Sequence, residues 1–156
     1  IEWHFIGPLQ SNKSKLVAER FDWVQSVDRE KLIERLNNQR PSGLAPLNVC
    51  LQINISGESS KSGTSEQEIF RLAELVSHSD RLVLRGLMAI PEHTSDESVL
   101  AAQMTRMQTL FTELARQYPT VDTLSMGMTE DLELAIAHGS TMVRVGTAIF
   151  GARDYS

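Results

Sequence analysis

The stretch of sequence that decides the fold lies near the C-terminus and reads STMVRVGTAIFG, residues 140–151. Its first half has the β-branched, alternating pattern of a strand, and its second half turns at a Gly-Thr step. Gly146 has no Cβ, so backbone can approach an anion closely, and the Thr147 hydroxyl and the next amides can donate hydrogen bonds to it. A short helix starting at Ala148 would add its N-terminal dipole. The junction suits a phosphate, although an ordinary buried strand and turn have the same pattern.

Arg144 stands in the middle of this strand. Along a strand it shares one face with Met142 and Gly146, while Val143 and Val145 share the other. The arginine is therefore either solvated or directed into a functional pocket. Its valine neighbours favour the pocket.

The rest of the chain repeats a strand followed by a helix. Five earlier strands are expected, at residues 3–7, 23–27, 49–54, 82–90 and 123–127. The helical patterns between them include a methionine-rich stripe with Met104 and Met107, which we interpret as core filling. Alternating strands and helices predict a parallel α/β sheet, which either closes as a barrel or stays open and doubly wound.

Length and composition limit the class of protein to which this chain can belong. With 156 residues, of which 41% are hydrophobic, we expect a single domain over residues 1–156. The chain has 15 Lys and Arg against 20 Asp and Glu, so nucleic acid is not an expected main partner. A single cysteine, Cys50, allows no internal disulfide and indicates a reducing compartment. Because the sequence shows neither a long apolar run nor a signal segment, we expect a cytoplasmic protein that does not enter a membrane.

Ligands of parallel α/β folds gather at the carboxyl ends of the strands. The loops after the last two strands, residues 125–129 and 145–148, are the most informative because barrel enzymes often bind phosphate there. Ser125 can donate its hydroxyl or its amide, whereas Thr129 is interpreted as a helix cap. The four histidines and Cys50 have no metal-ligand spacing, so no metal site is predicted.

Six blocks of sequence carry a resemblance to a known family. They are HFIGPLQSNK at 4–13, QIN at 52–54, ESSKSG at 58–63, RGLM at 85–88, LSMGM at 124–128 and VRVGTAIFG at 143–151. In this order they closely resemble the pyridoxal phosphate homeostasis protein family, and they span essentially the whole chain.

The resemblance implies a (β/α)8 TIM barrel like the N-terminal domain of alanine racemase. It also implies one pyridoxal 5'-phosphate (PLP) per subunit and a role in vitamin B6 and amino-acid homeostasis, without established catalysis. Matched by motif, Ser125, Gly146 and Thr147 would hold the phosphate, and Arg144 would face the pyridine nitrogen. Asn54 and Met88, at the ends of two middle strands, complete the predicted cofactor-binding set. PLP-dependent apoenzymes are the partners that such a carrier would serve, and a complete member would be a monomer.

The sequence also departs from the family. Members carry the PLP-linking lysine in an early strand, in a Ser-Lys-Thr-Lys-like motif before a Phe-Gly-Glu-Asn-like strand, and neither motif occurs here. About six of eight βα units are expected, so the chain resembles a C-terminal fragment that a missing segment, another chain or an altered assembly would complete. Without that lysine, PLP would be held by phosphate and ring contacts alone, and no catalytic residue is predicted.

Two other functions remain open from the sequence. A PLP-dependent amino-acid racemase would need the absent lysine and a second acid/base residue. A phosphate-binding barrel enzyme without PLP would use the same Gly-Thr turn for a phosphorylated sugar or precursor.

Overall fold

The computed structural model describes residues 1–59 and 62–155. The strands are β1 (His4–Phe5), β2 (Trp23–Val27), β3 (Leu47–Gln52), β4 (Leu82–Met88), β5 (Thr123–Met128) and β6 (Met142–Arg144). The α-helices are α1 (Ser14–Arg20), α2 (Glu30–Gln39), α3 (Ile69–Ser77), α4 (Glu97–Gln117), α5 (Leu132–Ala137) and α6 (Thr147–Phe150). Two 3-10 turns, η1 (Ser11–Lys13) and η2 (Glu66–Glu68), precede α1 and α3.

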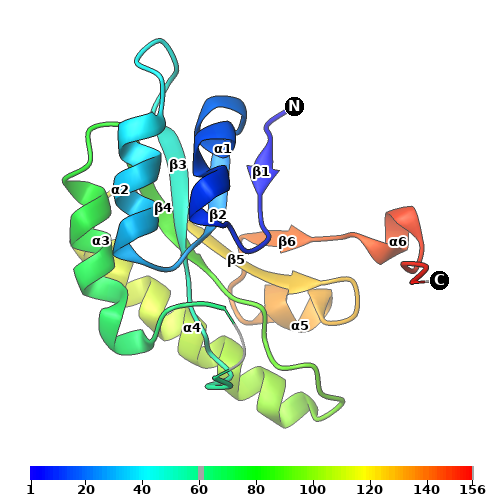
Figure 1. The fold of residues 1–156 in the computed structure, drawn as a ribbon. Coiled ribbons are helices and arrows are strands. Elements are labelled where there is room, and N and C mark those ends of the chain that lie inside the picture. The colour runs from blue at the N-terminus through cyan, green and yellow to red at the C-terminus, as the bar shows by residue number, and fades with distance from the viewer. Residues whose placement is uncertain (60–61, 156) are drawn as a thin grey trace.

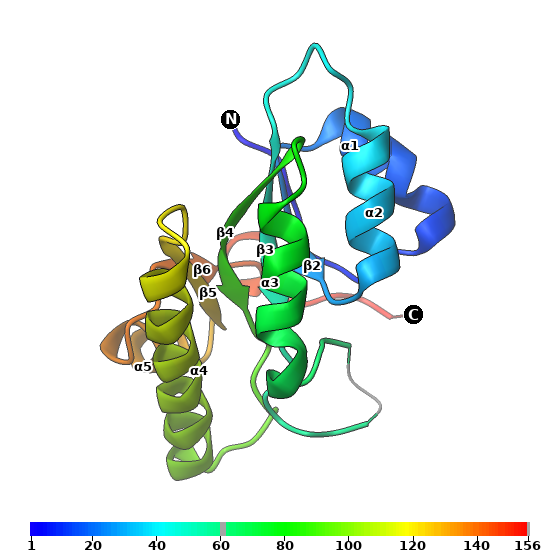
Figure 2. The ribbon, with the colours of Figure 1, turned by 90° about the vertical axis from the view of Figure 1, so that its left-hand side faces the viewer.

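The strands form one parallel sheet in the order β1-β2-β3-β4-β5-β6, which is the order of the chain. Helices α1 to α5 cover one face of this sheet, and Figure 2 looks onto the helical layer. A doubly wound sheet would reverse its strand order and carry helices on both faces. The sequential order with helices on one face is therefore that of a barrel segment, as the family resemblance implies (Figure 1).

Three of the predicted strands end earlier than the sequence patterns indicate, among them β4, which ends at Met88 and not at residue 90. β3 ends at Gln52 because the backbone amide of Asn54 donates to Thr64 O instead of to a neighbouring strand. β1 contains only two residues before the Gly7-Pro8 step. The prediction that Thr129 caps the fifth helix is wrong, because Asp131 precedes α5 and its Oδ1 accepts a hydrogen bond from the Met128 amide.

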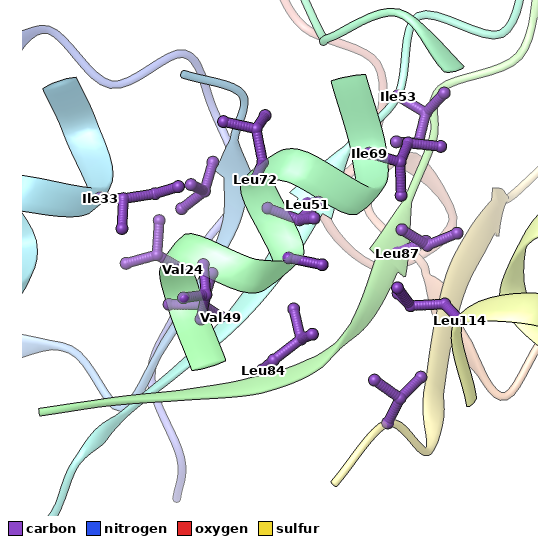
Figure 3. Close-up of a cluster of buried hydrophobic side chains, with 14 of the residues drawn as sticks. Val24, Ile33, Val49, Leu51, Ile53, Ile69, Leu72, Leu84, Leu87 and Leu114 are labelled. Carbon is purple, nitrogen blue, oxygen red and sulfur yellow. The ribbon is translucent and has the colours of Figure 1, made fainter. Parts of the chain in front are cut away.

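The main core lies between the sheet and its helices. Val24, Val49, Leu51, Leu84 and Leu87 point from β2, β3 and β4 toward Ile69 and Leu72 of α3, as Figure 3 shows. Met104 and Met107 of α4 are fully buried in the same core, which confirms that the methionine stripe fills space.

The opposite side of the sheet, which we call the inner face, carries a different set of side chains. Its members are Trp23, Gln25, Cys50, Met88, Ser125, Met142 and Arg144. Trp23, Cys50 and Met88 form a small buried cluster against which Met142 packs. His4 stacks on the Trp23 ring at 4.9 Å between centroids, and the Arg85 guanidinium lies 4.6 Å from the centre of that ring. Polar and apolar groups thus share the side of the sheet that corresponds to a barrel interior.

Candidate functional site

The last two strands bring Ser125 and Arg144 together on the inner face. In the β5–β6 pair, Ser125 lies opposite Met142, and Met128 lies opposite Arg144. Met142 and Arg144 share a face because side chains alternate along a strand, whereas Val143 lies on the other face near α5. Of the two orientations that the sequence allows for Arg144, the structure shows the inward one.

Two hydrogen bonds fix the Arg144 guanidinium. Its Nη1 donates to Ser125 Oγ at 2.7 Å, and its Nη2 donates to the backbone carbonyl of Ala89 at 2.9 Å, just beyond the end of β4. Burial lowers the pKa of Arg144, and the negative charge of Asp131 partly offsets this. The ordinary pKa of an arginine lies far above neutral pH, so the group stays cationic there.

The anchored guanidinium has N–H groups that these two hydrogen bonds do not use. It carries about five N–H groups, of which two are used in these bonds. Within the described part of the chain, the Arg144 Nε–H has no hydrogen-bond acceptor. A ligand on the inner face can therefore accept a hydrogen bond from a cation whose position is already set.

Ser125 also connects Arg144 to side chains that the sequence patterns did not single out. Its hydroxyl donates to Gln25 Oε1 at 2.5 Å, and the Gln25 Nε2 contacts His4 Nδ1 at 2.9 Å and Met142 Sδ at 3.3 Å. Gln25 is only 1% exposed. The signal that could have revealed it is a polar residue within a buried strand, the same signal that indicated Arg144.

The Gly-Thr turn stands at the start of α6, beyond the end of β6 (Figure 1). A Cβ added at Gly146 would meet no heavy atom within 4 Å, so the backbone is open to an approaching group. In residues 1–59 and 62–155, the amide N–H groups of Thr147 and Ala148 have no hydrogen-bond acceptor. Unlike Ser125 and Arg144, Gly146 and Thr147 are exposed and make no hydrogen bond to the inner-face pair.

The two remaining predicted residues occupy different surroundings. Met88 is fully buried in the inner-face cluster, one residue before the carbonyl that anchors Arg144. Asn54 organises the loop after β3: its Nδ2 donates to Glu58 O at 2.7 Å, and its Oδ1 accepts from the Ser56 hydroxyl at 3.1 Å. The structure therefore brings Met88 next to the Arg144 anchor but does not join Asn54 to it by a hydrogen bond.

The described residues contain neither a metal-binding cluster nor a helix able to span a membrane. No group of three or more His, Cys, Asp and Glu side chains there could hold a metal ion. Among the same residues, no helix combines the length and the apolar character needed to cross a membrane.

Comparison with known proteins shows to which family the chain belongs. The family model described as "Alanine racemase, N-terminal domain" matches residues 2–154. The pyridoxal phosphate homeostasis protein of Vibrio alginolyticus is 60% identical over 156 residues, which are 100% of this chain and 67% of that protein. The chain belongs to the pyridoxal phosphate homeostasis protein family. The Escherichia coli K12 member is 58% identical over 156 residues, again 100% of this chain and 67% of its own length. The chain thus spans about two thirds of the length of these curated relatives.

Solved structures of similar proteins agree with this family. PipY of Synechococcus elongatus, solved without PLP, has a TM-score of 0.88 at 36% identity, with 97% of this chain and 71% of PipY covered. PipY with PLP bound has a TM-score of 0.83 at 34% identity and the same coverage. D-threonine aldolase of Filomicrobium marinum, at 19% identity and a TM-score of 0.72 over 92% of this chain and 42% of the aldolase, shows the shared fold alone.

Proposed function

We propose that this chain is a PLP-binding barrel segment of a protein that serves PLP and amino-acid homeostasis, acting as a carrier or regulator without turnover. The observation that carries the proposal is Arg144, a partly buried cation anchored by Ser125 and the Ala89 carbonyl, with an N–H left for a ligand. The names of the relatives and the PLP-bound structure of PipY support the same ligand.

Arg144 suits the nitrogen of a pyridine ring. Its guanidinium donates a hydrogen bond without surrendering a proton, so a ring nitrogen that accepts this bond stays unprotonated. PLP supplies an electron-withdrawing ring when it is bound, and an unprotonated ring is the weaker electron sink. This pairing favours storage of the cofactor, or racemase-like chemistry, over transamination.

The phosphate would lie against the Gly-Thr turn. The open backbone at Gly146 and the free amides of Thr147 and Ala148 are suitable donors for an anion. Ser125 can join them only if its O–H turns away from Gln25, because a hydroxyl has one proton to donate. Asn54 after β3 and Met88 at the end of β4 would complete the cofactor-binding set.

A titration series tests this function. PLP, pyridoxal and ribose 5-phosphate are each titrated into the chain, with binding followed by absorbance or calorimetry. PLP should bind most tightly, since only PLP offers both the ring nitrogen and the phosphate. Equal binding of PLP and ribose 5-phosphate would instead support a phosphate-binding barrel that does not use PLP.

The same titration is repeated on Arg144→Ala, with Arg106→Ala as the control. Arg106 is a half-exposed arginine whose ion pair with Glu66 lies on the helical side of the sheet. Losing a hydrogen bond from a charged group should weaken PLP binding by about 10- to 100-fold in Arg144→Ala and leave the control unchanged. Unchanged PLP binding in a folded Arg144→Ala variant would contradict the role of Arg144.

A further inference from the structure

A continuous chain of hydrogen bonds crosses the inner face from β1 to β6. It runs from His4 through Gln25 and Ser125 to Arg144, with contacts of 2.9, 2.5 and 2.7 Å. Gln25 and Ser125 stand 100 positions apart in the sequence and are both buried. A buried polar side chain that is hydrogen-bonded through both its donor and its acceptor has a fixed orientation. It therefore also restricts the orientation of the groups to which it is bonded.

The direction of each hydrogen bond follows from the donors available. Arg144 can only donate, so it uses a lone pair of Ser125 Oγ and leaves the single O–H of Ser125 for another acceptor. Gln25 Oε1 is that acceptor, which turns the Gln25 amide nitrogen toward His4 Nδ1 and Met142 Sδ. The amide of Gln25 therefore serves as acceptor at one end and donor at the other.

His4 completes this arrangement as an acceptor. Its Nδ1 can accept from Gln25 only when it carries no proton, which requires the neutral ring. Burial lowers the pKa of His4, while the carboxylates of Glu2 and Asp22 act in the opposite direction. The neutral form is thus consistent with the surroundings of the ring.

We propose that Gln25 is a positioning residue for the cofactor site: it holds the Ser125 hydroxyl in the orientation in which Ser125 fixes Arg144. This inference deepens the proposed function, because the group being positioned is the one we assign to the pyridine ring. A leucine at this position fills similar volume but can neither accept from Ser125 nor donate to His4. A glutamate keeps the acceptor for Ser125 and loses the donor.

The first readout uses the ligand-free protein. The side-chain NMR signals of the Arg144 guanidinium report whether its rotation is restricted. Restricted signals are expected in the wild type and in Gln25→Glu, whereas averaged signals are expected in Gln25→Leu and in Ser125→Ala. Restricted signals in a folded Gln25→Leu protein, or averaged signals in a folded Gln25→Glu protein, would overturn the proposal.

A matched control separates positioning from general loss of a buried hydrogen bond. Gln39 Oε1 on α2 lies 2.7 Å from the Ser14 hydroxyl, a part-buried Ser–Gln contact in the helical layer, and the same hydroxyl also lies 2.8 Å from the Ser11 carbonyl. Gln39→Leu removes a side-chain contact far from Arg144 and should keep the restricted Arg144 signals. Loss of those signals in Gln39→Leu would mean that Arg144 responds to overall stability, which would also overturn the proposal.

The second readout is PLP affinity. Gln25→Leu should bind PLP about tenfold more weakly than the wild type, and Gln39→Leu within about twofold of it. Equal affinity in Gln25→Leu and wild type would overturn the link to the cofactor. If the wild type binds no PLP, the proposed function fails, and the ligand-free signals still decide whether Gln25 positions Arg144.

Discussion

Cys50 lies on the inner face beside Trp23 and Met88, with its side chain fully buried. Burial raises the pKa of its thiol from 9.0 to about 12, with Arg85 and Arg144 acting in the opposite direction. The thiolate is the reactive form, so this cysteine should be inert in the folded protein. Its role is the one that the sequence indicates, a small apolar side chain in the core.

This environment predicts both reactivity and pH dependence. At pH 8 a thiol reagent should label Cys50 only when urea unfolds the chain. Because the folded protein holds the thiol proton more tightly than the unfolded chain, stability should fall as pH rises from 9.0 toward about 12, by about 1.4 kcal/mol per unit from this group. Denaturant titrations of wild type and Cys50→Ala across that range measure the difference. Rapid labelling of the native protein would show that the thiol is accessible.

Single residues of the site differ in how far the sequence could predict them. Alternation places Arg144 on one face of its strand and its valine neighbours favour the inward orientation, which the structure shows. The role of Gln25 depends on a partner 100 positions away, and no periodicity within one strand contains that information. Alternation identifies the face on which a side chain lies, whereas its hydrogen-bond partner depends on which strands pair and in what register.

Among the elements, β4 contains an irregularity that only a glycine can occupy. The pairing of β3 with β4 shifts between Val49 and Cys50, and Gly86 lies at this shift. A Cβ at Gly86 would stand 1.7 Å from the carbonyl oxygen of Thr123 on β5. The close approach of the two backbones places Arg85 so that it reaches Asn48 and Asp122.

Gly86→Ala should therefore destabilise the protein strongly. We expect a loss of about 2–4 kcal/mol in the free energy of unfolding, because backbone atoms of β5 cannot move aside as a flexible side chain would. Gly43→Ala is the matched control, since a Cβ there meets no atom within 4 Å, and its effect should stay within about 0.5 kcal/mol. Urea denaturation measures both, and a similar stability for the two variants would contradict the close approach at β4.

The helices were predictable as elements but not at their ends. The apolar stripe with Met104 and Met107 indicated the helix that became α4, because such a helix must bury one apolar face against the sheet. The start of α5 was assigned to Thr129, while the structure uses Asp131. Thr129 and Asp131 have similar capping ability and stand two positions apart. Which of them precedes the helix depends on where β5 ends.

At the scale of the whole molecule, the residue patterns predict a parallel sheet. They do not determine whether the sheet closes into a barrel or stays open and doubly wound. Apolar strands alternating with helices are common to barrels and doubly wound sheets, so composition and periodicity cannot separate the two. The strand order separates them, since all neighbours in the sheet are neighbours in the chain. The family resemblance implied the same answer, because the order of motifs along the chain carries topological information that local patterns lack.

The place where this molecule holds PLP can be located from the chemical shifts of its own N–H groups. Two-dimensional ¹⁵N–¹H NMR spectra of the chain are recorded without PLP and with increasing PLP. We expect the amides of Gly146, Thr147 and Ala148 and the guanidinium of Arg144 to shift together with one saturation curve. Saturable shifts confined to other residues, or no shifts up to a large molar excess of PLP, would contradict this location of the cofactor.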